Sequence, residues 1–244
     1  MWIDKALSEL SDGITYSRED LLRILLSERP ELSDATFRWT LYNLLQERKI
    51  FKAGHDIYIT SEPDILPVYK PLYTDKAKTL NDMMRQRFPE VMYVMFESVL
   101  LNEFLNHQIA QNTIYVQVEK DVSYYIFDTL KEEYKGCVLY NPSKKEFDRY
   151  WIKDCIVVLD LISQSPLSVE NPHEMTIEKM LVDIISEKSI SAVFSPSEIT
   201  AMYANVINSY QIDRRKLNRY AGRRGKTELI KKYTGGAGYP VIHT

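Results

Sequence analysis

The sequence predicts an α+β protein of two domains: a small helical module with a β-hairpin, then an α/β domain with a mixed sheet and a C-terminal helical segment. Its 244 residues exceed the usual size of one domain. Helical patterns and then two short strands fill the first 60 residues, whereas apolar strand-like runs alternate with helices from residue 74 to residue 161. The composition, 45% hydrophobic and 27% charged, excludes disordered and collagen-like classes.

Three helices are expected at the start of the chain. The first covers residues 2–10. Ser17 is the expected N-cap of the second helix, with Asp20 three positions later, and Pro30 ends that helix. Ser33 caps the third. Their close spacing predicts one small module.

A strand, a turn and a second strand follow the third helix, which ends near residue 48. The strands are expected at residues 49–52 and 57–60. Three helices followed by a two-stranded wing is the element order of a winged helix-turn-helix. Residues 1–60 are therefore predicted to form a DNA-binding domain.

The third helix has an apolar side and a polar side when its residues are placed at 100° intervals. The apolar arc holds Phe37, Leu41, Leu44 and Leu45. The opposite arc, which is flanked by Thr40 and has Arg38 at its boundary, holds Thr36, Trp39, Asn43 and Gln46. Polar side chains of these types bond base edges and phosphates in the major groove, so this arc suits a recognition helix.

We therefore predict a contact with double-stranded operator DNA through this helix and the basic hairpin. The candidate residues are Thr36, Arg38, Trp39, Thr40, Asn43, Lys49, Lys52 and His55. The alternative is a solvated helix face with Trp39 packed on the second domain. The module's net charge of −2, from eight basic and ten acidic side chains, is unusual for a tight DNA binder.

Three prolines lie between residues 61 and 73, which are expected to be a linker. Residues 74–234 are assigned to the second domain and residues 235–244 to a flexible, glycine-rich tail. The expected strands of the second domain are 91–96, 113–119, 137–140 and 155–159, and its expected helices are 74–88, 98–106, 122–134, one with an apolar stripe from Ile177 to Ile185, and 195–210.

The charge is unevenly distributed along the chain. Residues 213–244 contain nine basic and two acidic side chains, a net +7, whereas residues 61–212 carry −8. Two readings of the basic end stay open. Either its arginines pair with acids of a preceding helix in a structural ion network, or they form a patch for phosphate or an acidic partner. The residues concerned are Glu178, Asp183, Arg219, Arg223 and Arg224.

We favour docking of at least one of these arginines. Leu217 and Tyr220, which lie between the charges, need an apolar surface. Arg214, Arg215 and Lys216 are expected to face solvent.

The motifs of common enzyme classes are missing from the sequence. It has no HExxH, Walker loop, GxSxG or GxGxxG, and its four histidines are not in ligand spacing. We therefore predict no enzymatic activity, cofactor or metal. The enzymatic alternative is a degenerate or active restriction-endonuclease-like nuclease, with Glu97 and Glu119 holding Mg²⁺ and Lys120 steadying phosphate. Glu119-Lys120 lacks the residue that usually separates the carboxylate from the lysine.

The expected location is the cytoplasm, without membrane contact. No apolar run approaches the roughly 20 residues that cross a bilayer, and the amino end has no secretion-signal pattern. Cys137 and Cys155 lie in apolar strand-like surroundings, so two reduced, buried thiols are expected.

Several segments together resemble a known family. They are the opening winged helix, Phe96-Glu97-Ser98 to Leu101-Asn102-Glu103-Phe104, the segment from Thr176 to Asp183, and Arg219-Tyr220-Ala221-x-Arg223-Arg224. In these the chain resembles the AbiEi-like antitoxins of type IV toxin–antitoxin systems and, more closely, a related family of uncharacterised bacterial winged-helix transcriptional regulators. The resemblance covers most of the chain. It implies a winged helix that represses its own operon and a second domain that neutralises a nucleotidyltransferase-like toxin encoded next to it.

Overall fold

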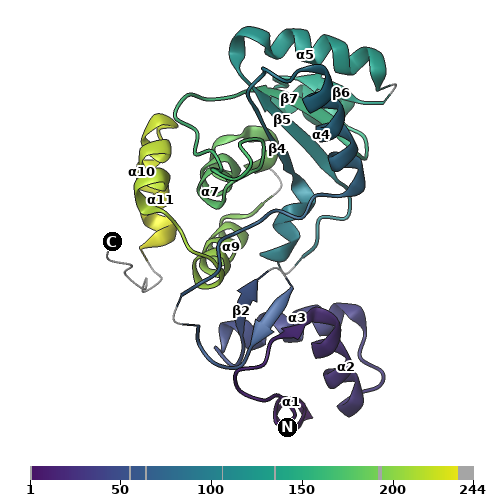
Figure 1. Ribbon diagram of the computed structural model, residues 1–244, viewed down its shortest axis with the longest axis vertical. Helices are drawn as coiled ribbons and strands as arrows, with labels where there is room; N and C mark the ends of the chain where they lie inside the picture. The colour runs from purple at the N-terminus through teal and green to yellow at the C-terminus, as the bar shows by residue number, and fades with distance from the viewer. Residues whose placement is uncertain are drawn as a thin grey trace. The chain divides into compact units, whose positions relative to one another are not determined.

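The structure is a computed structural model that describes residues 2–54, 56–63, 65–105, 107–134, 136–191 and 194–235. It is a mixed α+β protein with a mixed sheet and a helical C-terminal segment, as predicted (Figure 1). The chain divides into two compact units, one made of Met1–Lys70 and Asn205–Gln211 and the other of Pro71–Ala204 and Ile212–Thr244. The predicted tail lies outside the described residues except for Gly235.

The first unit contains three helices and an antiparallel sheet of order β1-β3-β2. Its elements are α1 (Trp2–Leu7), β1 (Tyr16–Ser17), α2 (Arg18–Glu28), α3 (Asp34–Gln46), β2 (Phe51–Gly54) and β3 (Ile57–Ile59). Ser17 caps α2 in a capping box with Asp20, and the Ser33 hydroxyl caps α3 by accepting from the Thr36 N–H, as the sequence indicates. The strand β1 was not predicted, because two residues show no periodicity.

The apolar arc of α3 lies in the core of this unit. Phe37, Leu41 and Leu44 are buried and Leu45 is half-buried. The core also contains Ala6, Leu21, Leu25, Leu32, Ile50 and Tyr58. The helix is therefore held by its apolar side, and its opposite side faces away from this core.

The second unit is built on a four-stranded mixed sheet of order β4-β5-β7-β6. The strands are β4 (Tyr93–Glu97), β5 (Thr113–Val118), β7 (Cys155–Asp160) and β6 (Val138–Tyr140). β4 runs antiparallel to β5, whereas β5 and β7 pair in parallel and β6 and β7 pair in parallel. β4 and β5 are buried throughout, which explains their continuous apolar sequence.

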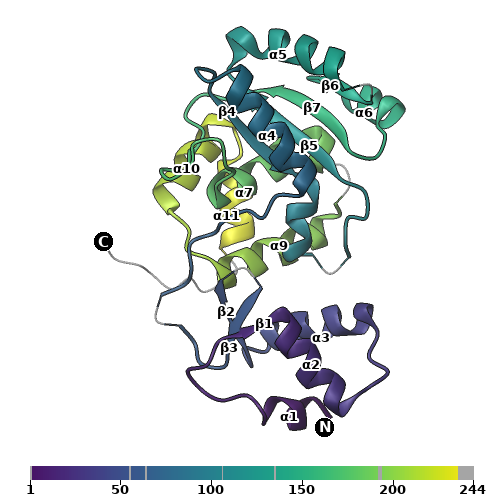
Figure 2. The same ribbon diagram turned by 45° about the vertical axis from the view of Figure 1, so that its right-hand side comes forward.

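Helices lie on both faces of this sheet (Figure 2). α4 (Asp75–Arg87) and α5 (Lys120–Glu133) pack on one face, where Leu80, Met84, Ile126 and Leu130 meet the side chains of Met95, Val116 and Val158. α7 (Ile177–Ser186) lies on the opposite face and is joined to β5 by hydrogen bonds from its buried side chains. The sheet is therefore the middle layer of three.

The remaining elements include several that the sequence did not indicate. η1 (Ser98–Glu103) and α9 (Pro196–Ser209) lie where helices were expected, at residues 98–106 and 195–210. The elements that were not predicted individually are α6 (Lys144–Tyr150), α8 (Lys188–Ser191), α10 (Arg214–Arg223) and α11 (Thr227–Thr234). α6 and α8 are short, and α10 contains so many charged residues that no apolar period reveals it. Across the described ranges, no helix combines the length and apolar character needed to cross a bilayer.

The expectation of two reduced, buried cysteines is wrong. Cys137 and Cys155 form a disulfide, and Cys137 is only half-buried. The physical reason is the strand register. Val138 pairs with Ile156, so the residues directly before them are neighbours at the start of two parallel strands, with Cα atoms 4.6 Å apart.

We expect reduction of this disulfide to destabilise the protein. The bridge joins residues with a sequence separation of 18, and a disulfide that closes a loop of that size raises the free energy of unfolding by about 2–4 kcal/mol. Dithiothreitol should therefore lower the free energy of unfolding measured in urea. The Cys137→Ser variant should start from the lower value and show no response to dithiothreitol; an equal response in both proteins would contradict the assignment.

Candidate functional site

The side of α3 that faces away from the core exposes a mixture of aromatic and amide side chains. Trp39 is 60% exposed, Gln46 is exposed, and Thr36 and Asn43 are half-buried. The Thr36 and Ser33 hydroxyls are 2.9 Å apart, and the Gln46 amide donates to Asn205 Oδ1. The structure therefore brings Thr36, Trp39 and Asn43 together on one face, as the helical wheel predicts.

Arg38 lies at the edge of that face and is bound within its own helix. Its Nη2 is 3.0 Å from the Asp34 carboxylate, one turn earlier. An exposed ion pair at this spacing contributes only a few tenths of a kcal/mol. The contact nevertheless neutralises the single cation of α3.

Two of the predicted DNA-contacting residues are buried, so that prediction is wrong for them. Thr40 is 1% exposed, because the buried side of α3 is wider than its apolar arc. Lys52 is 3% exposed, and its ammonium lies 5.9 Å from the Tyr58 ring centroid and 5.6 Å from that of Tyr210. It occupies the inward position of β2, where its ammonium makes cation–π contacts with two aromatic rings.

The hairpin cations that remain exposed have acidic neighbours. Lys49 Nζ lies 3.1 Å from Glu47 and 3.4 Å from Asp4, and the Lys49 pKa is raised mainly by the Glu47 carboxylate. Arg48 is ion-paired with Glu62. His55 lies outside the described residues. The exposed cations of the hairpin are therefore already paired with carboxylates, and a polyanion would have to displace these carboxylates to bind them.

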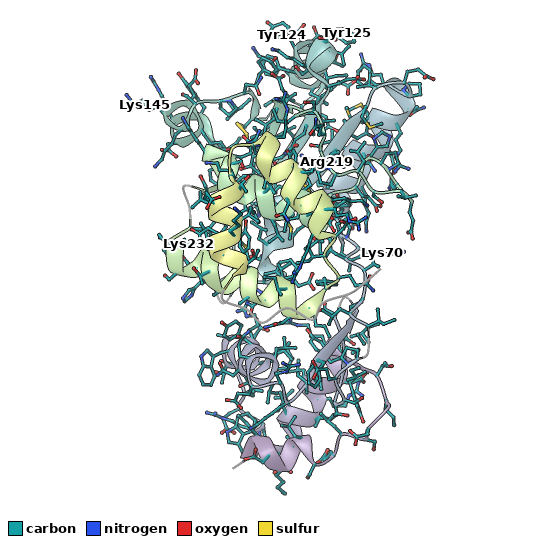
Figure 3. The ribbon with its side chains drawn as sticks, turned by 90° about the vertical axis from the view of Figure 1, so that its left-hand side faces the viewer. Lys70, Tyr124, Tyr125, Lys145, Arg219 and Lys232 are labelled. Carbon is teal, nitrogen blue, oxygen red and sulfur yellow. A yellow bond between two sulfur atoms is a disulfide. The ribbon has the colours of Figure 1, made fainter. Side chains whose placement is uncertain are left out.

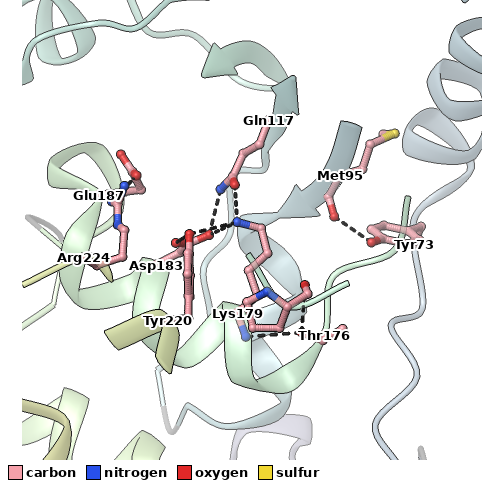
Figure 4. Close-up of polar contacts among 10 residues, drawn as sticks. Tyr73, Met95, Gln117, Thr176, Lys179, Asp183, Glu187, Tyr220 and Arg224 are labelled. Atoms are coloured by element: carbon pink, nitrogen blue, oxygen red, sulfur yellow. Dashed lines mark hydrogen bonds and ion pairs between the residues drawn. The ribbon is translucent and has the colours of Figure 1, made fainter. Parts of the chain in front are cut away.

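The second unit contains a buried polar cluster centred on Lys179 (Figure 4). Lys179 Nζ lies 2.7 Å from the Asp183 carboxylate, and it also donates to Gln117 Oε1 and, at 3.2 Å, to the Tyr220 hydroxyl. The Tyr220 hydroxyl and the Gln117 amide donate to Asp183 at 2.7 and 2.9 Å. All four side chains are at most 2% exposed.

Burial determines the electrostatics of this cluster. It lowers the pKa of Lys179, against the opposing effect of Asp183, and it raises the pKa of Tyr220. An ion pair without solvent is maintained only when further hydrogen bonds satisfy both partners, as Gln117 and Tyr220 do here. The cluster is therefore a structural link between β5, α7 and α10.

The predicted pairing of the C-terminal arginines with Glu178 and Asp183 is wrong in its partners. Glu178 accepts the backbone N–H of Asp213 at 2.8 Å, and Asp183 is bound by the Lys179 cluster. Arg224 is docked instead on Glu187, with 13% of its side chain exposed. Burial raises the pKa of Glu187 although the Arg224 guanidinium opposes this effect. Burial alone would lower the pKa of Arg224, but the carboxylates of Glu187 and Asp183 outweigh it, so the pKa of Arg224 is raised.

The side of α10 that faces away from its buried residues is exposed and strongly basic. Arg214, Arg215, Arg219 and Arg223 are exposed, whereas Leu217, Tyr220 and Ala221 are buried. Arg219 on α10 and Lys232 on α11 are both labelled on the face shown in Figure 3. Arg223 donates to Ser163 Oγ at 2.8 Å. The basic end therefore has two parts: Arg224, directly after α10, docks on Glu187, and the arginines within α10 face solvent.

Glu97 and Glu119 do not form the carboxylate pair of a nuclease. Glu97 pairs with Ile114 at one end of the β4–β5 ladder, whereas Glu119 follows Val118 at the other end, five residues or about 17 Å along β5. Glu97 is buried and accepts from Thr74 N–H and Oγ1 at 2.8 and 2.7 Å, and Glu119 accepts from the Met92 N–H. Within the described part of the chain, no group of three or more metal-ligating side chains was found.

Sequence reasoning missed the roles of Gln117 and Tyr220 and gave Asp183 the wrong partner. Gln117 is a polar residue inside an otherwise apolar strand, and Lys179 and Asp183 are four apart on a helix with an apolar stripe. Such opposite charges at i and i+4 next to buried positions were the available signal. The strand residue could not be linked to them without the tertiary structure.

Adjacent arginines should differ in their effect on stability. Arg224→Ala leaves Glu187, 21% exposed, without its cation and should lower the free energy of unfolding by about 1.5–3 kcal/mol. Arg223→Ala is the matched control on the exposed side and should change it by less than about 0.5 kcal/mol. Urea denaturation measures both; equal losses would contradict the docking of Arg224.

Comparison with known families gives one match. A model described as a family of unknown function, DUF6577, matches residues 36–237. No curated protein matches the sequence. The matched region includes α3 from Thr36 onward, the whole sheet of the second unit, the Lys179 cluster and the basic face of α10. Because it spans most of the 244 residues, the chain belongs to the DUF6577 family.

Proposed function

We propose that this DUF6577 protein is a DNA-binding transcriptional regulator that represses its own operon through a winged helix-turn-helix in the first unit. The order α1, β1, α2, α3, β2, β3, with β2 and β3 as the wing, supports this assignment. In that arrangement α3 is the recognition helix, which enters the major groove. The resemblance to antitoxin regulators agrees with this role.

The observation that carries the proposal is the outward face of α3. It presents Thr36, Trp39 and Asn43, whose hydroxyl, indole and amide groups suit contacts with base edges, while the helix is anchored by its opposite side. Trp39 is exposed within its own unit although its ring is largely apolar. A large aromatic in that position is more typical of a binding surface than of a solvated helix.

We expect the purified protein to bind a duplex from its own upstream region. The logarithm of affinity should fall with the logarithm of salt concentration, with a slope of about −0.9 per neutralised phosphate. Thr36→Ala/Asn43→Ala should lose about 1–3 kcal/mol per base contact removed, because neither side chain belongs to the core. Fluorescence anisotropy measures the affinities.

Asn218→Ala is the control, because Asn218 is an exposed amide on α10. It should bind like the parent protein. Absence of binding at low salt, or equal affinities for the parent and the α3 double variant, would refute the proposal.

We further propose that the second unit neutralises a protein partner, a nucleotidyltransferase-like toxin encoded next to this gene. The observation that favours a partner surface is on α5, where Tyr124 and Tyr125 are 63% and 62% exposed (Figure 3). The acidic side chains of Asp121, Asp128 and Glu132 share this exposed side. Tyrosines are enriched at protein interfaces and carry much of their binding energy.

Co-expression of this protein with the neighbouring toxin should relieve the growth arrest that the toxin causes. Tyr124→Ala/Tyr125→Ala should abolish the relief, because truncating an interface hot spot costs about 2 kcal/mol or more. Tyr150→Ala, at a tyrosine on α6 that is 52% exposed, should relieve arrest like the parent. Growth curves of the three strains decide, and arrest that persists with the parent protein removes this function.

A further inference from the structure

The outward face of α3 contains no charged side chain. Its positions are held by Ala35, Thr36, Trp39, Tyr42, Asn43 and Gln46. The charged residues of the helix, Asp34 and Arg38, are ion-paired with each other at 3.0 Å. Guanine is commonly read in the major groove by Arg or Lys, which donate to its O6 and N7 atoms. The central part of this face has neither.

The side chains that this face presents suit the A·T base pair instead. An asparagine amide donates to adenine N7 and accepts from adenine N6, and apolar side chains contact the methyl group of thymine. The amide of Gln46 is engaged by Asn205, which leaves Asn43 as the amide nearest the centre of the face. Trp39 is the exposed aromatic among the described residues of the first unit.

The spacing of these two residues fits stacked base pairs. Asn43 follows Trp39 by four positions, so they are about one helical turn, or about 6 Å, apart along α3. That rise covers roughly two steps of a duplex, whose pairs are about 3.4 Å apart. One helix can therefore place the indole and the amide on A·T pairs that are about two steps apart.

We propose that α3 selects A·T base pairs in the major groove, with Asn43 bonded to an adenine edge and Trp39 packed on a thymine methyl group. The inference rests on the proposed DNA-binding function and names its substrate, an operator with an A·T-rich half-site. Specificity then comes from amide and methyl contacts, and Arg38 has no part in reading the bases.

In vitro selection of randomised duplexes by the full-length protein identifies the preferred site. We expect A·T pairs at two positions of the half-site that are about two steps apart. Asn43→Arg should change one enriched adenine to guanine, because it replaces the adenine-bonding amide with a guanine-bonding guanidinium. Enrichment of G·C pairs by the parent protein at the position that Asn43→Arg changes would overturn the inference while leaving DNA binding intact.

Replacement of thymine by deoxyuridine removes only the methyl group. The parent protein should lose about fourfold in affinity at the contacted thymine, which corresponds to one buried carbon. Trp39→Ala should bind more weakly and show no further loss with deoxyuridine. Ile14→Ala, at an apolar residue of the same unit that is 50% exposed, should keep the fourfold loss.

The outcomes separate this inference from the function on which it rests. A deoxyuridine effect that persists in Trp39→Ala shows that another side chain reads the methyl group, and it overturns the role of Trp39. Selection that enriches no sequence refutes sequence-specific DNA binding itself, and the inference with it.

Discussion

The ammonium of Lys179 has no contact with solvent, and the second unit depends on how that charge is compensated. Its three partners come from β5, α7 and α10: Gln117, Asp183 and Tyr220. Losing any partner would leave a buried charge or a buried donor unsatisfied, at a cost of several kcal/mol. The three elements are consequently fixed to one another, which places the short basic helix α10 on α7 although its sequence has little apolar character.

This fixed position gives α10 two different sides. The side that meets α7 buries Leu217, Tyr220 and Ala221, and the adjacent Arg224 docks on Glu187. The other side exposes Arg214, Arg215, Arg219 and Arg223 to solvent. A stretch that reads as uniformly basic in sequence thus contains one arginine that stabilises the fold and others available to solvent, because only part of a helix's circumference can contact its neighbour.

In the first unit the charges are arranged differently. Arg38, Arg48 and Lys49 have carboxylate partners, and Lys52 is held between aromatic rings. The face of α3 that remains exposed is uncharged. In the proposed regulator, phosphate attraction would therefore contribute less than usual, and hydrogen bonds and methyl contacts would carry more of the discrimination between base pairs.

Periodicity and capping are local properties, and they were enough to predict the long helices, the Ser17 and Ser33 caps, the strands of the sheet and the buried side of α3. Which side chains meet depends on tertiary packing. Tertiary packing buries Thr40 and Lys52, places Glu97 and Glu119 at opposite ends of the β4–β5 ladder, and brings Cys137 and Cys155 together. Strand register and helix docking bring together residues far apart in the chain, and no local pattern encodes that proximity.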